Sequence, residues 1–331
     1  MNKKSIKYAI GILVTLLALW FSFRNLDWQQ LTFSFLRVNW FWVAAAVLSS
    51  LFTVYALGWR WRLLLEPKIH LSMYSMFQLN IISQYLNIVI PGRFGELARA
   101  WLPARQHQVS GSYILGTVVI EKMFDFFAWI ILWLSAPAFF AFHNELEARG
   151  YKLALIASIF MVAALALIMW KKEMVRQWIE FFTRILPAGL RKKIRDFMDL
   201  GMDAFGLLKN IKTTLAFIIY TAFIILLSSL TNYLLFKAFG FHLSLFEALI
   251  LLLVIMVGNV PPSVPGKIGI FEWMIILGLA VFGINRTDAL SYGIMLHLVS
   301  YLPKILLGFV YMANLNLSIK KAGTEFGGVN E

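Results

Sequence analysis

The sequence has 331 residues and a formal net charge of +13, yet 60% of its residues are hydrophobic and only 14% are charged. A soluble globular domain is about 45–50% apolar and about 25% charged. These proportions argue against a soluble enzyme, a disordered chain and a nucleic-acid-binding module, and they indicate a protein surrounded by lipid. The chain has no cysteine, which excludes disulfides and thiolate chemistry.

Apolar runs follow one another along most of the chain. The first, 8–23, comes after three lysines and lacks a small-residue cleavage site, so we interpret it as a retained signal-anchor helix. Further runs cover residues 40–57, 71–90, 112–142, 153–170, 213–236, 243–260, 268–282 and 289–312. Several are shorter than the roughly 20 residues that cross the hydrocarbon core. We therefore predict an all-α polytopic membrane protein with about eight membrane segments.

The distribution of lysine and arginine predicts the orientation, because cytoplasmic loops carry an excess of these residues. If both termini, residues 60–68 and the connection 171–212 are cytoplasmic, 18 of the 30 basic residues lie on that side and 6 on the other. The remaining 6 lie in or beside apolar runs. We therefore expect a multi-pass protein of the cytoplasmic (inner) membrane with both termini inside. The 171–212 connection mixes aromatic residues with cations, which is typical of interfacial amphipathic helices.

A Pro-Gly-basic-apolar-Gly motif, preceded by an asparagine and followed by an acid, occurs twice. Its two copies run from Asn87 to Glu96 and from Asn259 to Glu272. Proline removes a backbone donor and glycine permits positive φ, so each copy should end one helix and start another. The residues that we predict to break the helices are Pro91, Gly92, Gly95, Pro265, Gly266 and Gly269.

The two motifs are predicted to enter the membrane from opposite sides. The run before Pro91 starts in the cytoplasm, whereas the run before Pro265 starts outside. Inverted-repeat transporters have this arrangement, and their broken helices meet near the bilayer midplane. We therefore predict a single membrane domain, 1–331, with repeats at about 40–142 and 213–313. The alternative for each motif is an ordinary loop between two transmembrane helices.

Ionisable side chains within apolar runs cost a few kcal/mol and indicate function by default. Glu121 and Asp125 are four residues apart and share one helix face. They either pair with Arg93 or Arg99, or form a protonatable pair that couples transport to proton movement. A second group shares the faces of the two helices at the first motif: Asn80, Gln84, Asn87, Arg93, Glu96 and Arg99. It is either a self-neutralising ladder with interhelical amide bonds or an anion site with one positive charge to spare.

Arg93 and Lys267 each stand where a new helix begins, so free N–H groups and the helix dipole add to their charge. Such sites suit a lipid phosphate. The predicted phosphate-binding residues are Arg93, Arg99, Lys267, Asn87 and Asn259. The predicted charge partners or proton-coupling residues are Glu96, Glu121, Asp125 and Glu272, with Lys304 beside the last. The histidines have no metal-ligand spacing, and we expect neither a metal nor another cofactor.

These motifs, in this order, resemble the flippase-like family, also called the lysylphosphatidylglycerol synthase transmembrane-region family. The resemblance spans nearly the whole chain. It implies a membrane protein related to the part of bacterial aminoacyl-phosphatidylglycerol synthases that is held to flip the modified lipid. The sequence departs from the family pattern at Lys122, Lys267 and Phe271, where the family usually has arginine, glycine and arginine. It contains no aminoacyl-transferase domain, so we do not expect it to aminoacylate lipids alone.

The predicted function is the movement of an anionic phospholipid or polyprenyl-phosphate-linked lipid between leaflets, without covalent chemistry. The expected partners are anionic membrane lipids and no nucleic acid. Two alternatives remain: a membrane-embedded glycosyltransferase, and a non-catalytic membrane partner of a separate lipid-modifying synthase.

Overall fold

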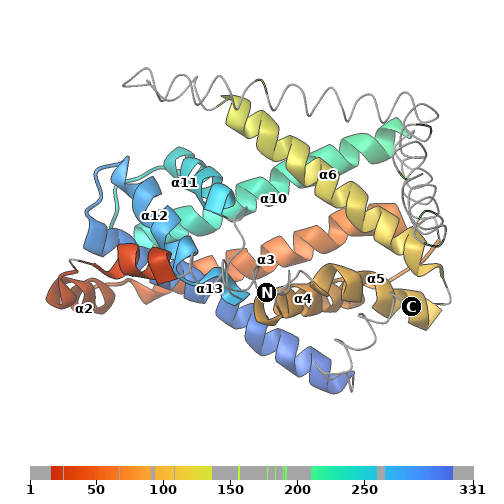
Figure 1. Ribbon diagram of the computed structural model, residues 1–331, viewed down its shortest axis with the longest axis horizontal. Helices are drawn as coiled ribbons and strands as arrows, with labels where there is room; N and C mark the ends of the chain where they lie inside the picture. The colour runs from red at the N-terminus through yellow and green to blue at the C-terminus, as the bar shows by residue number, and fades with distance from the viewer. Residues whose placement is uncertain are drawn as a thin grey trace. The chain divides into compact units, whose positions relative to one another are not determined.

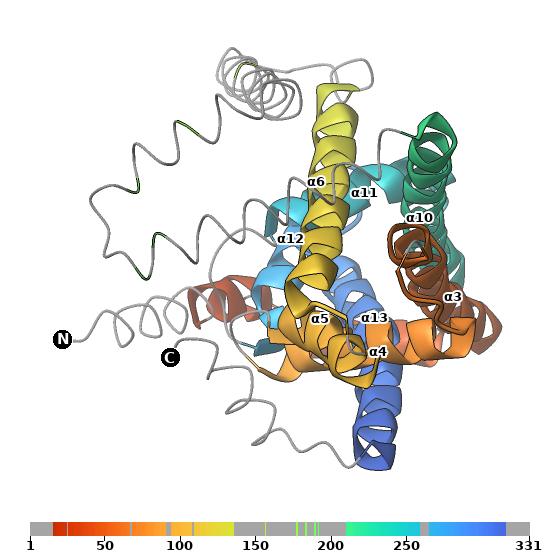
Figure 2. The same cartoon turned by 90° about the vertical axis from the view of Figure 1, so that its right-hand side faces the viewer.

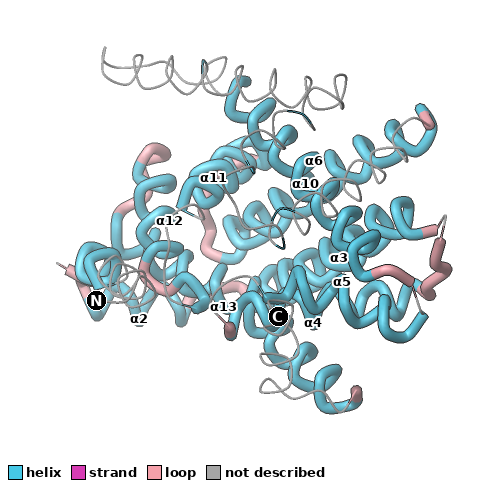
Figure 3. The backbone as a smooth tube through the Cα atoms, turned by 45° about the vertical axis from the view of Figure 1, so that its right-hand side comes forward, coloured by secondary structure: helices cyan, strands magenta, loops and turns pink. Residues whose placement is uncertain are grey.

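The computed structural model describes residues 16–24, 26–66, 68–90, 94–107, 109–135, 210–258 and 265–315, and the single residues 156, 177, 183, 189 and 191. Every regular element in these ranges is a helix (Figure 3). The all-α prediction is therefore confirmed. Outside the described residues lie the first half of the signal-anchor run, Pro91, Gly92 and Arg93, Asn259, and nearly all of the 153–170 run and the 171–212 connection.

The helices follow the predicted apolar runs in order (Figure 1). They are α2 (Trp28–Leu36), α3 (Trp40–Leu65), α4 (Met73–Val89), α5 (Phe94–His107), α6 (Gly111–Ser135), α10 (Ile211–Ala238), α11 (Leu245–Gly258), the short 3-10 helix η3 (Pro265–Lys267), α12 (Ile270–Ala280) and α13 (Arg286–Asn314). Within the described residues, α3, α10 and α13 are long and apolar enough to cross a membrane, whereas α11 and α12 are apolar but shorter. The chain is a multi-pass membrane protein.

Two helices differ from the prediction. α3 continues to Leu65 rather than ending near Leu57, because the charge at Arg60 is buried and paired instead of marking a loop. α2 occupies a stretch that we expected to connect two spans. Asp27 starts it by accepting the backbone N–H groups of Gln29 and Gln30 at 2.9 and 3.0 Å, a standard N-cap.

The structure divides into two compact units. The first comprises Met1–Trp59, Leu71–Arg99 and Ala222–Glu331, and the second comprises Arg60–His70 and Ala100–Thr221. In the first unit α13 packs against α2, α4 and α12, and α12 packs against α11 (Figures 1 and 2). Its core is almost wholly apolar, with Tyr292 fully buried and donating a hydrogen bond to the carbonyl of Asn232 at 3.1 Å.

α11 and α12 form an antiparallel hairpin. A Cβ on Gly258, the last residue of α11, would lie 2.3 Å from the Met274 side chain, and one on Gly278 would lie 2.7 Å from Leu251. The last residue of α11 therefore meets the first half of α12, and the middle of α11 meets late α12. The glycines permit this close approach, as small residues do at helix interfaces in membranes.

The contact between α13 and α4 also depends on a glycine. A Cβ on Gly308 would lie 2.3 Å from Cβ of Tyr85, so Gly308→Ala should lower the free energy of unfolding by about 1–3 kcal/mol. Gly293→Ala, in the same helix, is the matched control because the nearest neighbour of its Cβ would be Ile275 at 3.4 Å, an ordinary contact. Thermal unfolding in detergent measures both. Equal stability of the two variants would contradict the observed packing of α13 on α4.

Candidate functional site

The second Pro-Gly motif forms η3 and a tight reversal before α12. Gly266, Lys267 and Gly269 all have positive φ, at 74°, 57° and 89°. Lys267 is the one non-glycine residue with positive φ in the described part of the chain. Such a conformation costs of order 1–3 kcal/mol in a non-glycine residue and persists only where the surrounding structure imposes it. η3 also packs against α4 within the first unit, so the cation at this break lies beside the helix that precedes the other break.

A buried acid–base pair follows the second break. Glu272 lies in the first turn of α12, and its Oε2 accepts the backbone N–H of Gly269 at 2.6 Å. Its Oε1 lies 2.6 Å from Nδ1 of His297 on α13. The imidazole packs edge-on against Phe271 and Tyr301, with ring centroids 4.8 and 4.4 Å away. One carboxylate therefore closes the N-terminus of α12 and joins it to α13.

The first break is held by an amide instead of a carboxylate. α4 ends at Val89 and α5 begins at Phe94. Oδ1 of Asn87 accepts the backbone N–H of Gly95 at 2.9 Å. A Cβ on Gly95 would lie 1.8 Å from the carbonyl oxygen of Ser83, so the start of α5 touches the backbone of α4 well before its end. After the break the chain therefore turns back along α4.

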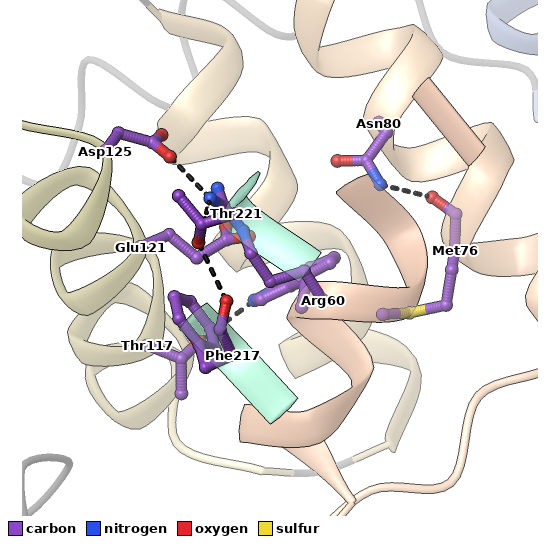
Figure 4. A network of polar contacts seen from close by, with 9 residues as sticks. Arg60, Met76, Asn80, Thr117, Glu121, Asp125, Phe217 and Thr221 are labelled. Atoms are coloured by element: carbon purple, nitrogen blue, oxygen red, sulfur yellow. Dashed lines mark hydrogen bonds and ion pairs between the residues drawn. The ribbon is translucent and has the colours of Figure 1, made fainter. Parts of the chain in front are cut away.

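The other residues predicted at the first break lie in different environments. Arg93 is outside the described residues, Glu96 is half-buried and Arg99 is buried. Asn80 is buried one helix turn after Met76, and its amide donates to the carbonyl of Met76 at 3.0 Å (Figure 4). A bond of this kind satisfies the side chain within its own helix.

A second charged cluster lies in the second unit and is centred on Arg60 (Figure 4). Nη1 of Arg60 lies 2.5 Å from Oδ1 of Asp125 and donates to Oγ1 of Thr221 at 3.1 Å, and Nε lies 3.5 Å from Oε1 of Glu121. The guanidinium also lies 5.1 Å from the ring centroid of Phe217. Arg60 and Glu121 are each 1% exposed, and Asp125 is 28% exposed. The arginine therefore joins the last turns of α3 to α6 and to the start of α10.

Neighbouring contacts tie the same elements together. Nε1 of Trp61 donates to Oγ1 of Thr117 at 3.0 Å, and the hydroxyl of Tyr113 donates to the carbonyl of Leu64 at 3.1 Å. Glu121 and Asp125 share one helix face, as the spacing predicts. Their partner in the structure is Arg60, which the sequence analysis assigned to a cytoplasmic loop.

The comparisons with known proteins now decide the family. The sequence model of the protein family described as the lysylphosphatidylglycerol synthase TM region matches residues 8–308, which is most of the chain. The chain belongs to this family. The resemblance stated from the motifs is thereby confirmed.

Two curated relatives extend the comparison. A UPF0104 membrane protein of Methanocaldococcus jannaschii is 23% identical over 235 residues, which are 70% of this chain and 96% of that protein. A UPF0104 membrane protein of Methanothermobacter thermautotrophicus is 23% identical over 271 residues, which are 77% of this chain and 78% of that protein.

Within this member of the lysylphosphatidylglycerol synthase TM-region family, the sequence reasoning missed two residues of the charged sites. Arg60 is followed by Leu63, Leu64 and Leu65, which was a signal that the helix continues past it. His297 lies in the middle of an apolar run, where an ionisable side chain is itself a signal of a buried partner. Lys267 and Glu272 lie at the second helix break, and Glu121 and Asp125 lie in the cluster around Arg60, whereas Arg93 and Asn259 lie outside the described residues.

Proposed function

We propose that this protein moves an anionic phospholipid or a polyprenyl-phosphate-linked lipid between the leaflets of the cytoplasmic membrane. The observation that carries the proposal is Lys267. This cation is held in a left-handed conformation at a broken helix, two residues before Gly269, the N-cap of α12. A helix N-terminus with a lysine beside it is a site for a phosphate group.

The lengths of the helices support a site within the membrane. α11 has 14 residues and α12 has 11. At about 1.5 Å per residue they extend about 21 and 16 Å, short of the roughly 30 Å hydrocarbon core. We infer that this hairpin is re-entrant and that α4 and α5 form its counterpart in an inverted repeat. Irregular backbone at such depth is tolerated where it lines a water-filled cavity or is buried in protein.

The other residues have complementary roles in the proposal. Arg93, Arg99, Asn87 and Asn259 would join Lys267 around the phosphate. Glu96, Glu121, Asp125 and Glu272 would balance charge or carry protons. We propose no covalent step and no cofactor, and both termini would face the cytoplasm. A separate lipid-modifying enzyme would supply the transported lipid.

Lys267→Gly tests this function sharply, because glycine adopts the positive φ of this position without strain while removing the charge. In liposomes with trace fluorescent phosphatidylglycerol, we expect the flipping rate to fall about tenfold or more, since a hydrogen bond to a charged group contributes about 1.5–3 kcal/mol.

Lys237→Ala is the matched control, because Lys237 is an exposed lysine at the end of α10 that packs over Tyr233. It should flip lipid at the wild-type rate. If Lys267→Gly flips every anionic lipid tested at the wild-type rate, the anion site is rejected. The alternative of a non-catalytic membrane partner of a separate synthase is then favoured. Sugar transfer from a lipid-linked donor would favour the glycosyltransferase.

A further inference from the structure

Glu272 and His297 form a hydrogen-bonded pair that must contain a proton between its two atoms. Oε1 of Glu272 and Nδ1 of His297 are 2.6 Å apart, and both atoms are acceptors unless one of them is protonated. With one proton, the imidazole is neutral, the carboxylate is charged and the pair carries −1. With a second proton the pair is neutral overall, whether as an imidazolium–carboxylate ion pair or as a carboxylic acid beside a neutral imidazole.

The buried environment of the pair lets this change of one proton affect neighbouring charged groups. Glu272 is buried and His297 is mostly buried, so neighbouring charges are poorly screened. The carboxylate also holds the N–H of Gly269, whose carbonyl accepts hydrogen bonds from Ser22 at 3.4 Å and from the backbone of Trp273 at 2.9 Å. The Glu272 carboxylate is thus hydrogen-bonded to the backbone of the break at Gly269, two residues after Lys267.

Among the described residues, few other ionisable groups lie on the elements packed around the pair. α4 contributes only tyrosines, α11 has only Glu247 in its first turn, and α2 has only its N-cap Asp27 and its C-cap Arg37. α13 itself carries Tyr301 against the imidazole and Lys304 further on, with Arg286 and Asp288 in its first turn and Tyr292 and Tyr311 elsewhere. The 16–24 segment carries Arg24, and η3 carries Lys267. Lys267 is the cation of the break that the pair closes.

We propose that Glu272 and His297 form a proton-binding site whose protonation favours the binding of an anionic lipid head group at Lys267. The inference rests on the proposed function and identifies the proton as the ion that is coupled to lipid transport. In the −1 state the pair is a local counter-charge for Lys267 and repels an incoming phosphate. Uptake of one proton neutralises the pair, so the local potential at the break becomes more positive and favours an anionic head group.

Thermodynamic linkage makes the effect reciprocal. If protonation of the pair strengthens anion binding, anion binding must strengthen proton binding by the same factor. The site therefore binds one proton together with one lipid phosphate. Histidine suits this role because its charge changes between about pH 5 and 8.

The experiment measures the proton directly. The protein, labelled with 15N-histidine, is placed in phosphatidylcholine nanodiscs with and without phosphatidylglycerol, and the histidine resonances are titrated by NMR. His297→Asn identifies the resonance among the five histidines. We expect phosphatidylglycerol to raise the proton affinity of His297 by about fivefold or more beyond its effect on the exposed His107. The exposed His107 is the reference for effects of the anionic lipid that do not depend on the second break.

Lys267→Gly is the decisive variant. It should abolish the additional rise in the proton affinity of His297 that phosphatidylglycerol causes, and leave the effect of phosphatidylglycerol on His107 unchanged. In liposomes, flipping by the wild-type protein should be about fivefold or more faster at about pH 5.5 than at about pH 8, and His297→Asn should flatten this profile. His107→Asn is the control and should retain the profile.

A His297 that does not titrate, or whose shift survives in Lys267→Gly, overturns the inference. Loss of flipping in Lys267→Gly with an unchanged titration of His297 would uphold the proposed function and reject the proton site. If no lipid is flipped at any pH, the proposed function fails, and the titration still decides whether His297 and Lys267 are coupled.

Discussion

Arg60→Met should lower the free energy of unfolding by about 3–5 kcal/mol, the usual cost of breaking a buried ion pair on one side only. Methionine is shorter than arginine but matches its aliphatic stem and fits an apolar span, so the effect comes mainly from the lost guanidinium. The variant leaves Glu121, which is 1% exposed, and Asp125 as two carboxylates on one face of α6 without the arginine between them. Thermal and denaturant unfolding of the purified protein in detergent measures the loss.

Two further variants serve as controls for Arg60→Met. Arg62→Met removes a 38% exposed arginine whose partner Glu66 lies 2.8 Å away in the next turn, and such a surface pair contributes only about 0–1 kcal/mol. The triple variant Arg60→Met/Glu121→Gln/Asp125→Asn removes all three charges and should recover most of the stability, because replacing a whole buried network with neutral groups is often close to neutral. If Arg60→Met is as stable as Arg62→Met, the buried network does not hold these helices together.

Arg60 also shows what the sequence could and could not predict. The order of the helices and the two breaks follow from composition, apolar runs and the Pro-Gly motifs, because these are local properties of the chain. The partner of a buried charge is not local. Glu121 and Asp125 are more than fifty residues from Arg60 in the sequence, and the positive-inside rule alone favours a loop at Arg60.

The acid–base pair illustrates the same limit. The capping role of Glu272 could be predicted from its position three residues after Gly269. The contact with His297 could not, because it depends on how α12 packs against α13. Likewise, Asn87 is predicted to bind phosphate, but only the structure shows that its side-chain oxygen accepts a hydrogen bond from the backbone N–H of Gly95 in α5, so any contact with a phosphate would come from its amide NH2 group. Only tertiary packing shows which polar atoms are already engaged.

Gly95→Ala should be among the most damaging single substitutions in the first unit. The new Cβ would lie 1.8 Å from the carbonyl oxygen and 2.7 Å from the carbonyl carbon of Ser83, which are backbone atoms of α4 and cannot rotate away. The start of α5 would have to move, and the bond from the Gly95 N–H to Asn87 would be lost with it. Overpacking of about 1–3 kcal/mol and a lost hydrogen bond of about 1 kcal/mol together predict a destabilisation of about 2–4 kcal/mol.

The matched control is Gly111→Ala at the start of α6, where a Cβ would make only an ordinary 3.7 Å contact with Ala104. Thermal unfolding in detergent should separate the two alanine variants clearly. Lipid flipping should fall further than stability alone requires in Gly95→Ala, because Glu96 and Arg99 move with the first turns of α5, and small displacements of binding groups are costly. A Gly95→Ala protein as stable and active as Gly111→Ala would show that α5 does not return against Ser83, and the re-entrant hairpin proposed for the first repeat would have to be abandoned.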